Sequence, residues 1–211
     1  MIISNQKNAL GIKIQETTVK FLDITLNENL TFMEYVNKVT SNISTSVGIM
    51  RRLHCQLPAN AMVKLYYSLV YSHLTYALLA WGRSGSTNAA KIECAHRRAC
   101  KLLTDYNQKI LSFHSIYDYF ALLKVFNTNT HNFHKYFKDK LSSHQLSHIH
   151  NTRHRTNSNF NTALFNHSKT QKYHLFQLIH IWKSIPKLLK NCTFKFTFKK
   201  QIKSYLLASQ S

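Results

Sequence analysis

Acidic residues are scarce in this chain of 211 residues, which has 8 Asp and Glu against 28 Lys and Arg. No two acids are adjacent in the sequence. Phosphoryl transfer by two metal ions needs carboxylates held close together, so we expect no such centre and no enzyme activity of the chain on its own. The GxxxxGKS/T, GxGxxG and GxSxG patterns are also missing, and we expect neither catalytic residues nor a cofactor.

Glycine and proline are nearly as rare, at 4 and 2 residues. An all-β fold needs many tight turns, which these two residues favour, so their scarcity favours long helices. Hydrophobic residues make up 44% of the chain, enough for an ordinary core.

The four cysteines form no CxxC pair, which is typical of reduced thiols and favours a cytoplasmic or nuclear location. The first residues have no apolar stretch of the kind found in a signal peptide. The longest apolar stretch, Leu69 to Trp81, contains Ser72, His73 and Thr75 and is too short to span a bilayer. We therefore expect no transmembrane segment.

Histidine is abundant, with 13 residues, but its spacing does not indicate a metal site. The closest groupings are His131 with His134, and His144 with His148 and His150. No cysteine lies near them to complete a zinc site, so we interpret them as solvated side chains and expect no metal. His54 and Cys55 are neighbours, which places their side chains on different sides of a helix and disfavours a nucleophile pair.

The positive charge, formally +20, is concentrated toward the C-terminus. Asp139 is the last acid, and the 72 residues from Lys140 to Ser211 carry 12 Lys or Arg. Such an excess favours a polyanion as partner: RNA, DNA or a hybrid of the two, or an anionic membrane surface. A compositional bias toward Lys, Asn and His would also raise the charge.

Hydrophobic periodicity predicts a mostly α fold with a short N-terminal β ribbon and a basic C-terminal extension. Residues 1–30 are predicted to form the ribbon, with Val19 to Leu26 extended and a turn at Asn27 to Asn29. Residues 31–141 read as a helical domain, 142–172 as a polar basic loop or arm, and 173–211 as short helical elements.

Several helix signals lie within this domain. Thr31 to Glu34 reads as a capping box before an apolar stripe that ends near residue 54. Pro58 suits the first turn of a second helix, which would run toward Trp81. A third helix would follow Ser86 or Thr87 and reach Leu103. Residues 116–137 predict one or two aromatic-rich helices, with a break near 127–130.

Several stretches together resemble the region that follows the catalytic motifs in non-LTR retrotransposon reverse transcriptases of the jockey or LINE type. Residues 19–32, VKFLDITLNENLTF, are similar to that family's KFLGVTLDENLTW segment. Residues 65–82 are similar to its LYYSLIxPxLTYxxxxWG segment, and 91–99 to its KIxxxQxRAxRxI segment. NTR at 151–153, IWKSIP at 181–186 and the FKK and YLL groups after 197 continue the likeness to about residue 208.

The chain departs from that pattern at several positions. Asp23 stands where the family has Gly, Asn27 where it often has Asp, Phe32 where it has Trp and Ser72 where Pro is usual. We expect a side chain at Asp23 to lie where the glycine lets backbone pass closely. The family's catalytic aspartates belong to a palm that would precede Met1.

The resemblance implies that residues 1–30 correspond to the palm edge and residues 31–141 to the thumb, which holds the template and primer. A catalytic palm would then come from another chain. Phosphate contacts by basic helix faces position a duplex without reading its sequence. The candidate nucleic-acid-binding residues are Arg51, Arg52, Arg97, Arg98, Lys101, Arg153, Arg155, Lys199, Lys200 and Lys203.

Three other hypotheses about the function fit the same sequence. The apolar helix stripes would also suit a helical protein-interaction module that docks on a partner. A basic amphipathic helix would suit a membrane surface. An inert transposon remnant would show the same residues without a selected function.

Overall fold

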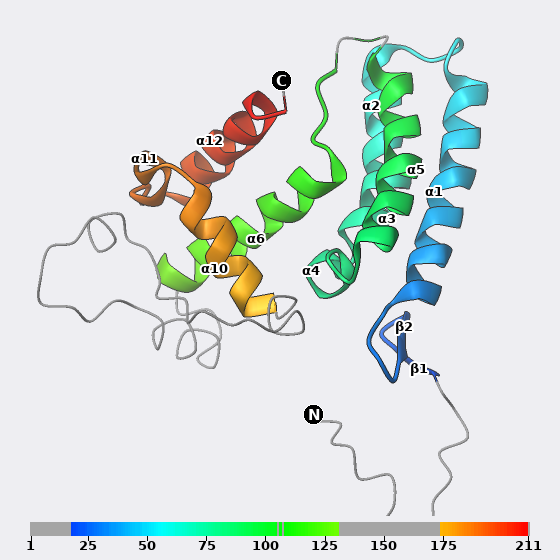
Figure 1. The fold of residues 1–211 in the computed structure, drawn as a ribbon. Helices are drawn as coiled ribbons and strands as arrows, with labels where there is room; N and C mark the ends of the chain where they lie inside the picture. The colour runs from blue at the N-terminus through cyan, green and yellow to red at the C-terminus, as the bar shows by residue number, and fades with distance from the viewer. Residues whose placement is uncertain (1–17, 105, 107, 131–173, 211) are drawn as a thin grey trace, which may run out of the picture.

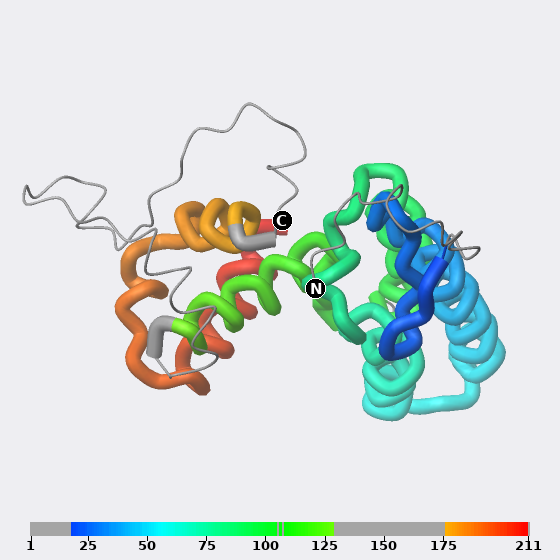
Figure 2. The backbone as a smooth tube through the Cα atoms, turned by 90° about the horizontal axis from the view of Figure 1, so that it is seen from below, coloured from blue at the N-terminus to red at the C-terminus, as the bar shows by residue number. Residues whose placement is uncertain are grey.

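The computed structural model describes residues 18–104, 106, 108–130 and 174–210. Helices make up most of this part of the chain, and a two-stranded ribbon precedes them, which confirms the predicted mostly α class. The helices form two groups that are joined through α6 (Figures 1 and 2). The expected arm at 142–172 lies outside the described residues.

The ribbon is an antiparallel hairpin of β1 (Thr18–Phe21) and β2 (Ile24–Asn27). Its turn was not predicted, because residues 19–26 read as one extended run. Phe21 pairs with Ile24, so the two-residue turn consists of Leu22 and Asp23, whose φ angles are 47° and 63°. Positive φ at both positions is the requirement of a type I′ turn, which matches the twist of the strands.

Asp23 does not obstruct the backbone, contrary to the expectation. Its carboxylate is exposed and pairs with Lys38 at 2.8 Å and with Lys20 at 2.9 Å. These hydrogen bonds from Lys38 and then Lys20 lower the pKa of Asp23 to about 2. Glycine suits this position because of its positive φ, and aspartate is among the few other residues that tolerate it.

The first helix group contains α1 (Met33–Leu53), α2 (Ala59–Leu65), the π-helical turn η1 (Tyr66–Tyr71), α3 (Ser72–Thr75), α4 (Leu78–Trp81) and α5 (Ser86–Thr104). The predicted stripe on α1 is buried from Val36 to Met50. α1 and α5 lie side by side and run in the same direction (Figure 1). Asn88 donates to the Thr31 carbonyl at one end, and His54 contacts the Leu102 carbonyl at the other.

The predicted capping box at Thr31 does not form. Phe32 precedes α1 with a left-handed φ of 55°, and no side chain caps the helix. The Thr31 N–H donates to the Asn27 side chain at 2.8 Å, and its carbonyl accepts from Asn88 at 2.8 Å. These two contacts hold Thr31 against the ribbon and α5, away from the position that would let it cap α1 with Glu34.

The segment from Pro58 to Trp81 begins as predicted but is not one regular helix. Pro58 precedes α2, and the chain then passes through the π-helical turn and α3. The helix stops at Tyr76, and Ala77 takes a left-handed φ of 48° before α4. The Trp81 indole N–H donates to the Tyr76 carbonyl at 2.8 Å, which stabilises the break.

The second helix group contains α6 (Phe113–Thr130), α10 (His174–Ser184), α11 (Lys187–Lys190) and α12 (Lys195–Ala208). α10 and α12 agree with the short helical elements expected within residues 173–211, and both pack on α6. The predicted break near 127–130 is wrong, because α6 continues to Thr130. Thr128 is buried with its hydroxyl on the Lys124 carbonyl, and Phe126 stacks on Phe198 at 4.1 Å, so packing maintains the helix there.

Candidate nucleic-acid interface

The exposed side of α5 carries a stripe of basic residues. Lys91, Arg98 and Lys101 are exposed at spacings of seven and three, which places them on one face of the helix. The opposite face, from Ile92 to Leu103, is buried in the first helix group. The core therefore fixes the side of α5 from which these three cations project.

Arg97 lies at the edge of this stripe. Its guanidinium is 3.8 Å from the Glu93 carboxylate, and its side chain is 68% exposed while that of Glu93 is 18% exposed. A long pair at the surface is weak, so Arg97 remains accessible to an anion.

Arg51 and Arg52 are exposed in the last turn of α1. They lie near the C-terminal end of α5, because His54 contacts Leu102 there at 3.1 Å. The C-terminal ends of two parallel helices carry partial negative charge, which basic residues offset. These two arginines and Lys101, in the last turn of α5, therefore stabilise the helix ends in addition to any contact with a ligand.

Lys199, Lys200 and Lys203 form a second exposed stripe, on α12. The other side of this helix buries Phe198, Ile202 and Leu206. α12 packs on α6 and lies apart from α1 (Figures 1 and 2). The predicted residues thus occupy two separate surfaces, while Arg153 and Arg155 lie outside the described residues.

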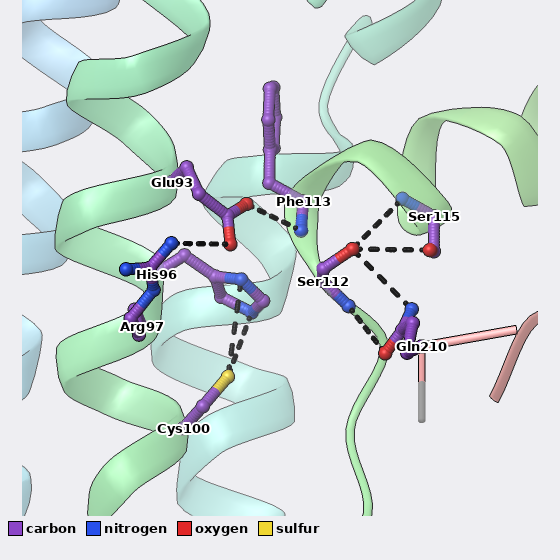
Figure 3. A network of polar contacts seen from close by, with 8 residues as sticks. All are labelled: Glu93, His96, Arg97, Cys100, Ser112, Phe113, Ser115 and Gln210. Carbon is purple, nitrogen blue, oxygen red and sulfur yellow. Dashed lines mark hydrogen bonds and ion pairs between the residues drawn. The ribbon is translucent and has the colours of Figure 1, made fainter. Parts of the chain in front are cut away.

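A polar network that the sequence did not indicate joins the two helix groups (Figure 3). The Glu93 carboxylate accepts the backbone N–H of Phe113, the first residue of α6, at 3.0 Å. Near the chain end, the Gln210 side chain contacts the N–H and hydroxyl of Ser112 at 3.4 Å each. Glu93 therefore provides a hydrogen-bond acceptor for a backbone N–H at the start of α6, which has no partner within the helix. Its carboxylate is engaged there and is not free to contact a ligand.

His96 is a second polar residue that periodicity alone did not single out. It is 1% exposed, and its Nε2 lies 2.7 Å from the Tyr66 hydroxyl and 3.4 Å from the Cys100 sulfur. Burial lowers the pKa of His96 to about 4 and raises the pKa of Cys100 to about 12. Cys100 is therefore a protonated thiol, which is a poor nucleophile.

Arg83 and Asp118 form an ion pair at 2.7 Å between the segment after α4 and the second turn of α6. The Arg83 guanidinium also lies 4.9 Å from the centre of the Tyr117 ring. Burial raises the pKa of Asp118, although the neighbouring Arg83 opposes that shift. The pair joins the two helix groups, so we assign it a structural role.

A pocket of about 500 Å³ lies between α3–α4 and α6. Residues of both segments line it: Thr75, Ala77, Leu78, Leu79, Ala80, Phe120 and Lys124. The lining is mostly apolar, and burial lowers the pKa of Lys124 at its edge. A ligand site usually adds several convergent polar groups to an apolar wall, which this lining does not provide.

Within residues 18–104, 106, 108–130 and 174–210, no three His, Cys, Asp or Glu side chains are close enough to hold a metal ion. No helix in this part of the chain is both long and apolar enough to cross a membrane. Comparison with protein-family models, curated proteins and solved structures found no match to the chain.

Proposed function

We propose that this chain is a nucleic-acid-binding module that holds backbone phosphates with basic helix faces and contributes no catalytic group of its own. The observation that carries the proposal is the exposed stripe of Lys91, Arg98 and Lys101 on α5, with Arg97 at its edge. The opposite face of α5 is buried in the core. Cations fixed on one side of a rigid helix position a polyanion without reading its sequence.

The overall charge supports the same proposal. A formal charge of +20 attracts polyanions from a distance and accelerates their association. The last 72 residues contain 12 Lys or Arg and no acid, so an anionic ligand would relieve their mutual repulsion.

The resemblance to non-LTR reverse transcriptases supports a more specific form of the proposal. In that form the chain acts as a thumb that holds a template–primer duplex. A hybrid duplex would then be gripped through its backbone and shape.

The test is a binding measurement by fluorescence anisotropy with an RNA–DNA hybrid, duplex DNA and single strands across a salt series. Arg97→Ala/Arg98→Ala/Lys101→Ala is expected to weaken binding to every ligand. It should also reduce the slope of log affinity against log salt by roughly 2 to 3, since each lost phosphate contact removes about 0.9 on B-DNA.

The control, Lys64→Ala/Lys109→Ala/Lys187→Ala, removes the same number of charges from exposed positions outside the α5 stripe. It should leave the slope nearly unchanged. Equal effects of the two triple variants would show that only net charge matters. No binding by the folded protein at low salt would overturn the proposal.

A second candidate function is protein interaction through the ribbon. In the hairpin register Val19 opposes Leu26 and Phe21 opposes Ile24, so the four side chains share one face. Ile24 is buried and Leu26 is half-buried against the core, but Val19 is 57% and Phe21 61% exposed. Half of an apolar face is thus uncovered, as at a site where another chain docks.

A further inference from the structure

The corner between α11 and α12 exposes three large apolar side chains. Leu188 is 84%, Phe194 74% and Phe196 80% exposed. Leu188 lies on α11, while Phe194 precedes α12 and Phe196 lies in its first turn. Side chains this exposed contribute nothing to the core, so their exposure requires another explanation.

Loose packing does not explain it, because the next phenylalanine is firmly held. Phe198 is completely buried and stacks on Phe126 with ring centres 4.1 Å apart and planes 13° apart. The centre of the Trp182 ring lies 6.2 Å from that of Phe198. Phe198 therefore fixes the start of α12 and, with it, the outward direction of Phe194 and Phe196.

The exposed rings are interleaved with lysines. Phe196, Lys199, Lys200 and Lys203 follow at positions i, i+3, i+4 and i+7, so they share one face of α12 over roughly 10 Å. Lys195 separates the two rings in sequence. Within the described part of the chain, Lys195, Lys199 and Lys200 have no ion-pair partner. The corner thus presents apolar rings beside several ammonium groups.

We propose that this corner is a binding site for single-stranded nucleic acid. Phe194 and Phe196 stack on unpaired bases, while Lys195, Lys199 and Lys200 contact the adjoining phosphates. Stacking on aromatic side chains beside a positive groove is how proteins hold single strands without sequence preference. The inference rests on the proposed function and adds a preference for unpaired strands at this corner.

Two alternatives fit the same residues less well. The bases of a duplex are stacked on one another and leave no face for Phe194 or Phe196. An anionic membrane would attract the lysines, but inserting both rings would draw the intervening Lys195 toward the hydrocarbon at a cost.

The test compares a labelled 12-nucleotide single-stranded RNA with a duplex of the same sequence, using the full chain. Phe194→Ala/Phe196→Ala is expected to weaken single-strand binding roughly 10- to 100-fold, because each lost stacking contact is large. The salt slope should not change, since no phosphate contact is lost. Duplex affinity should change less than about twofold by the same reasoning.

Two further variants distinguish the contribution of the aromatic rings to binding from that of the lysine charges. Phe194→Trp/Phe196→Trp keeps an aromatic face and should retain single-strand affinity. Lys199→Ala/Lys200→Ala should reduce the salt slope. Both phenylalanines are exposed, so circular dichroism should show unchanged helix content in the alanine variant.

The outcomes distinguish this inference from the proposed function. If the wild-type chain binds no nucleic acid, the proposed function and this inference both fail. If it binds but the alanine variant loses nothing, or loses single-strand and duplex affinity equally, only the stacking site is overturned. Flotation with phosphatidylserine vesicles that depends on the two rings, with unchanged RNA binding, would assign the corner to membranes instead.

Discussion

At the scale of single residues, His96 shows how burial controls a titratable group. The ring is enclosed in the first helix group and contacts the Tyr66 hydroxyl at 2.7 Å. Because a charged imidazole loses its hydration there, the pKa of His96 falls from 6.5 to about 4. The native protein therefore keeps His96 neutral under conditions in which the unfolded chain would protonate it.

This difference in the pKa of His96 between the native and unfolded states predicts that the protein is less stable in acid. Between pH 6.5 and pH 4 the unfolded chain binds a proton at His96 that the native protein does not bind. The free energy of unfolding should therefore fall as the pH is lowered through this window, by about 3 kcal/mol in total. His96→Gln, which can still accept from Tyr66, should show a smaller fall when urea unfolding is measured at pH 7 and pH 4.

Asp118, whose pKa is raised in the native protein, contributes with the opposite sign, since it favours the native state as the pH falls. Wild type and His96→Gln both contain Asp118, so the difference between the two proteins isolates His96. Identical pH dependence in wild type and His96→Gln would contradict the assignment.

At the scale of the elements, Gly82 allows the end of α4 to approach α6. A Cβ atom at Gly82 would lie 2.7 Å from the Leu78 carbonyl oxygen and 2.7 Å from the Tyr117 ring. The Leu78 oxygen is backbone and cannot move aside without disturbing α4. Gly48, in the interior of α1, is different, since a Cβ atom added there would have no atom within 4 Å.

Replacing each of these two glycines with alanine should change the free energy of unfolding in opposite directions. Gly82→Ala is expected to lower the free energy of unfolding by about 1–3 kcal/mol, because it forces α4 and α6 apart. Gly48→Ala should raise it by about 0.5–1 kcal/mol, because alanine loses less entropy in a helix. Urea unfolding of both variants measures this difference, and a Gly82→Ala protein as stable as Gly48→Ala would refute the close approach.

At the scale of the whole molecule, net charge and exposed apolar surface have opposite effects on self-association. The net charge of +20 keeps copies of the chain apart. The ribbon nevertheless exposes Val19 and Phe21 next to the exposed Leu22, Leu30 and Met33. A patch of this kind favours association once the repulsion is screened.

Association should therefore depend on salt. At low ionic strength sedimentation velocity is expected to show a monomer. In 1 M salt, where the screening length is about 3 Å, larger species should appear. Val19→Thr/Phe21→Thr should remain monomeric there, whereas Ile49→Thr, which alters an exposed apolar residue on α1, should behave as wild type. Association of the ribbon variant equal to that of wild type would exclude the ribbon as the contact surface.

Periodicity was sufficient to predict the apolar stripe of α1 that is buried in the structure. The sequence also named Arg97, Arg98 and Lys101 as candidate residues, and they lie on the exposed side of α5. It did not show that the predicted basic residues divide between two surfaces, because the separation of α12 from α1 depends on packing against α6.

The sequence by itself determined the mostly α class, the excess of positive charge and the amphipathic helices, since these follow from composition and from the spacing of apolar residues along one element. Tertiary structure alone decided the turn at Leu22 and Asp23, the continuation of α6 through Thr128 and the exposure of Phe194 and Phe196. The physical reason is that spacing reveals which side chains share a face, whereas burial depends on which faces meet.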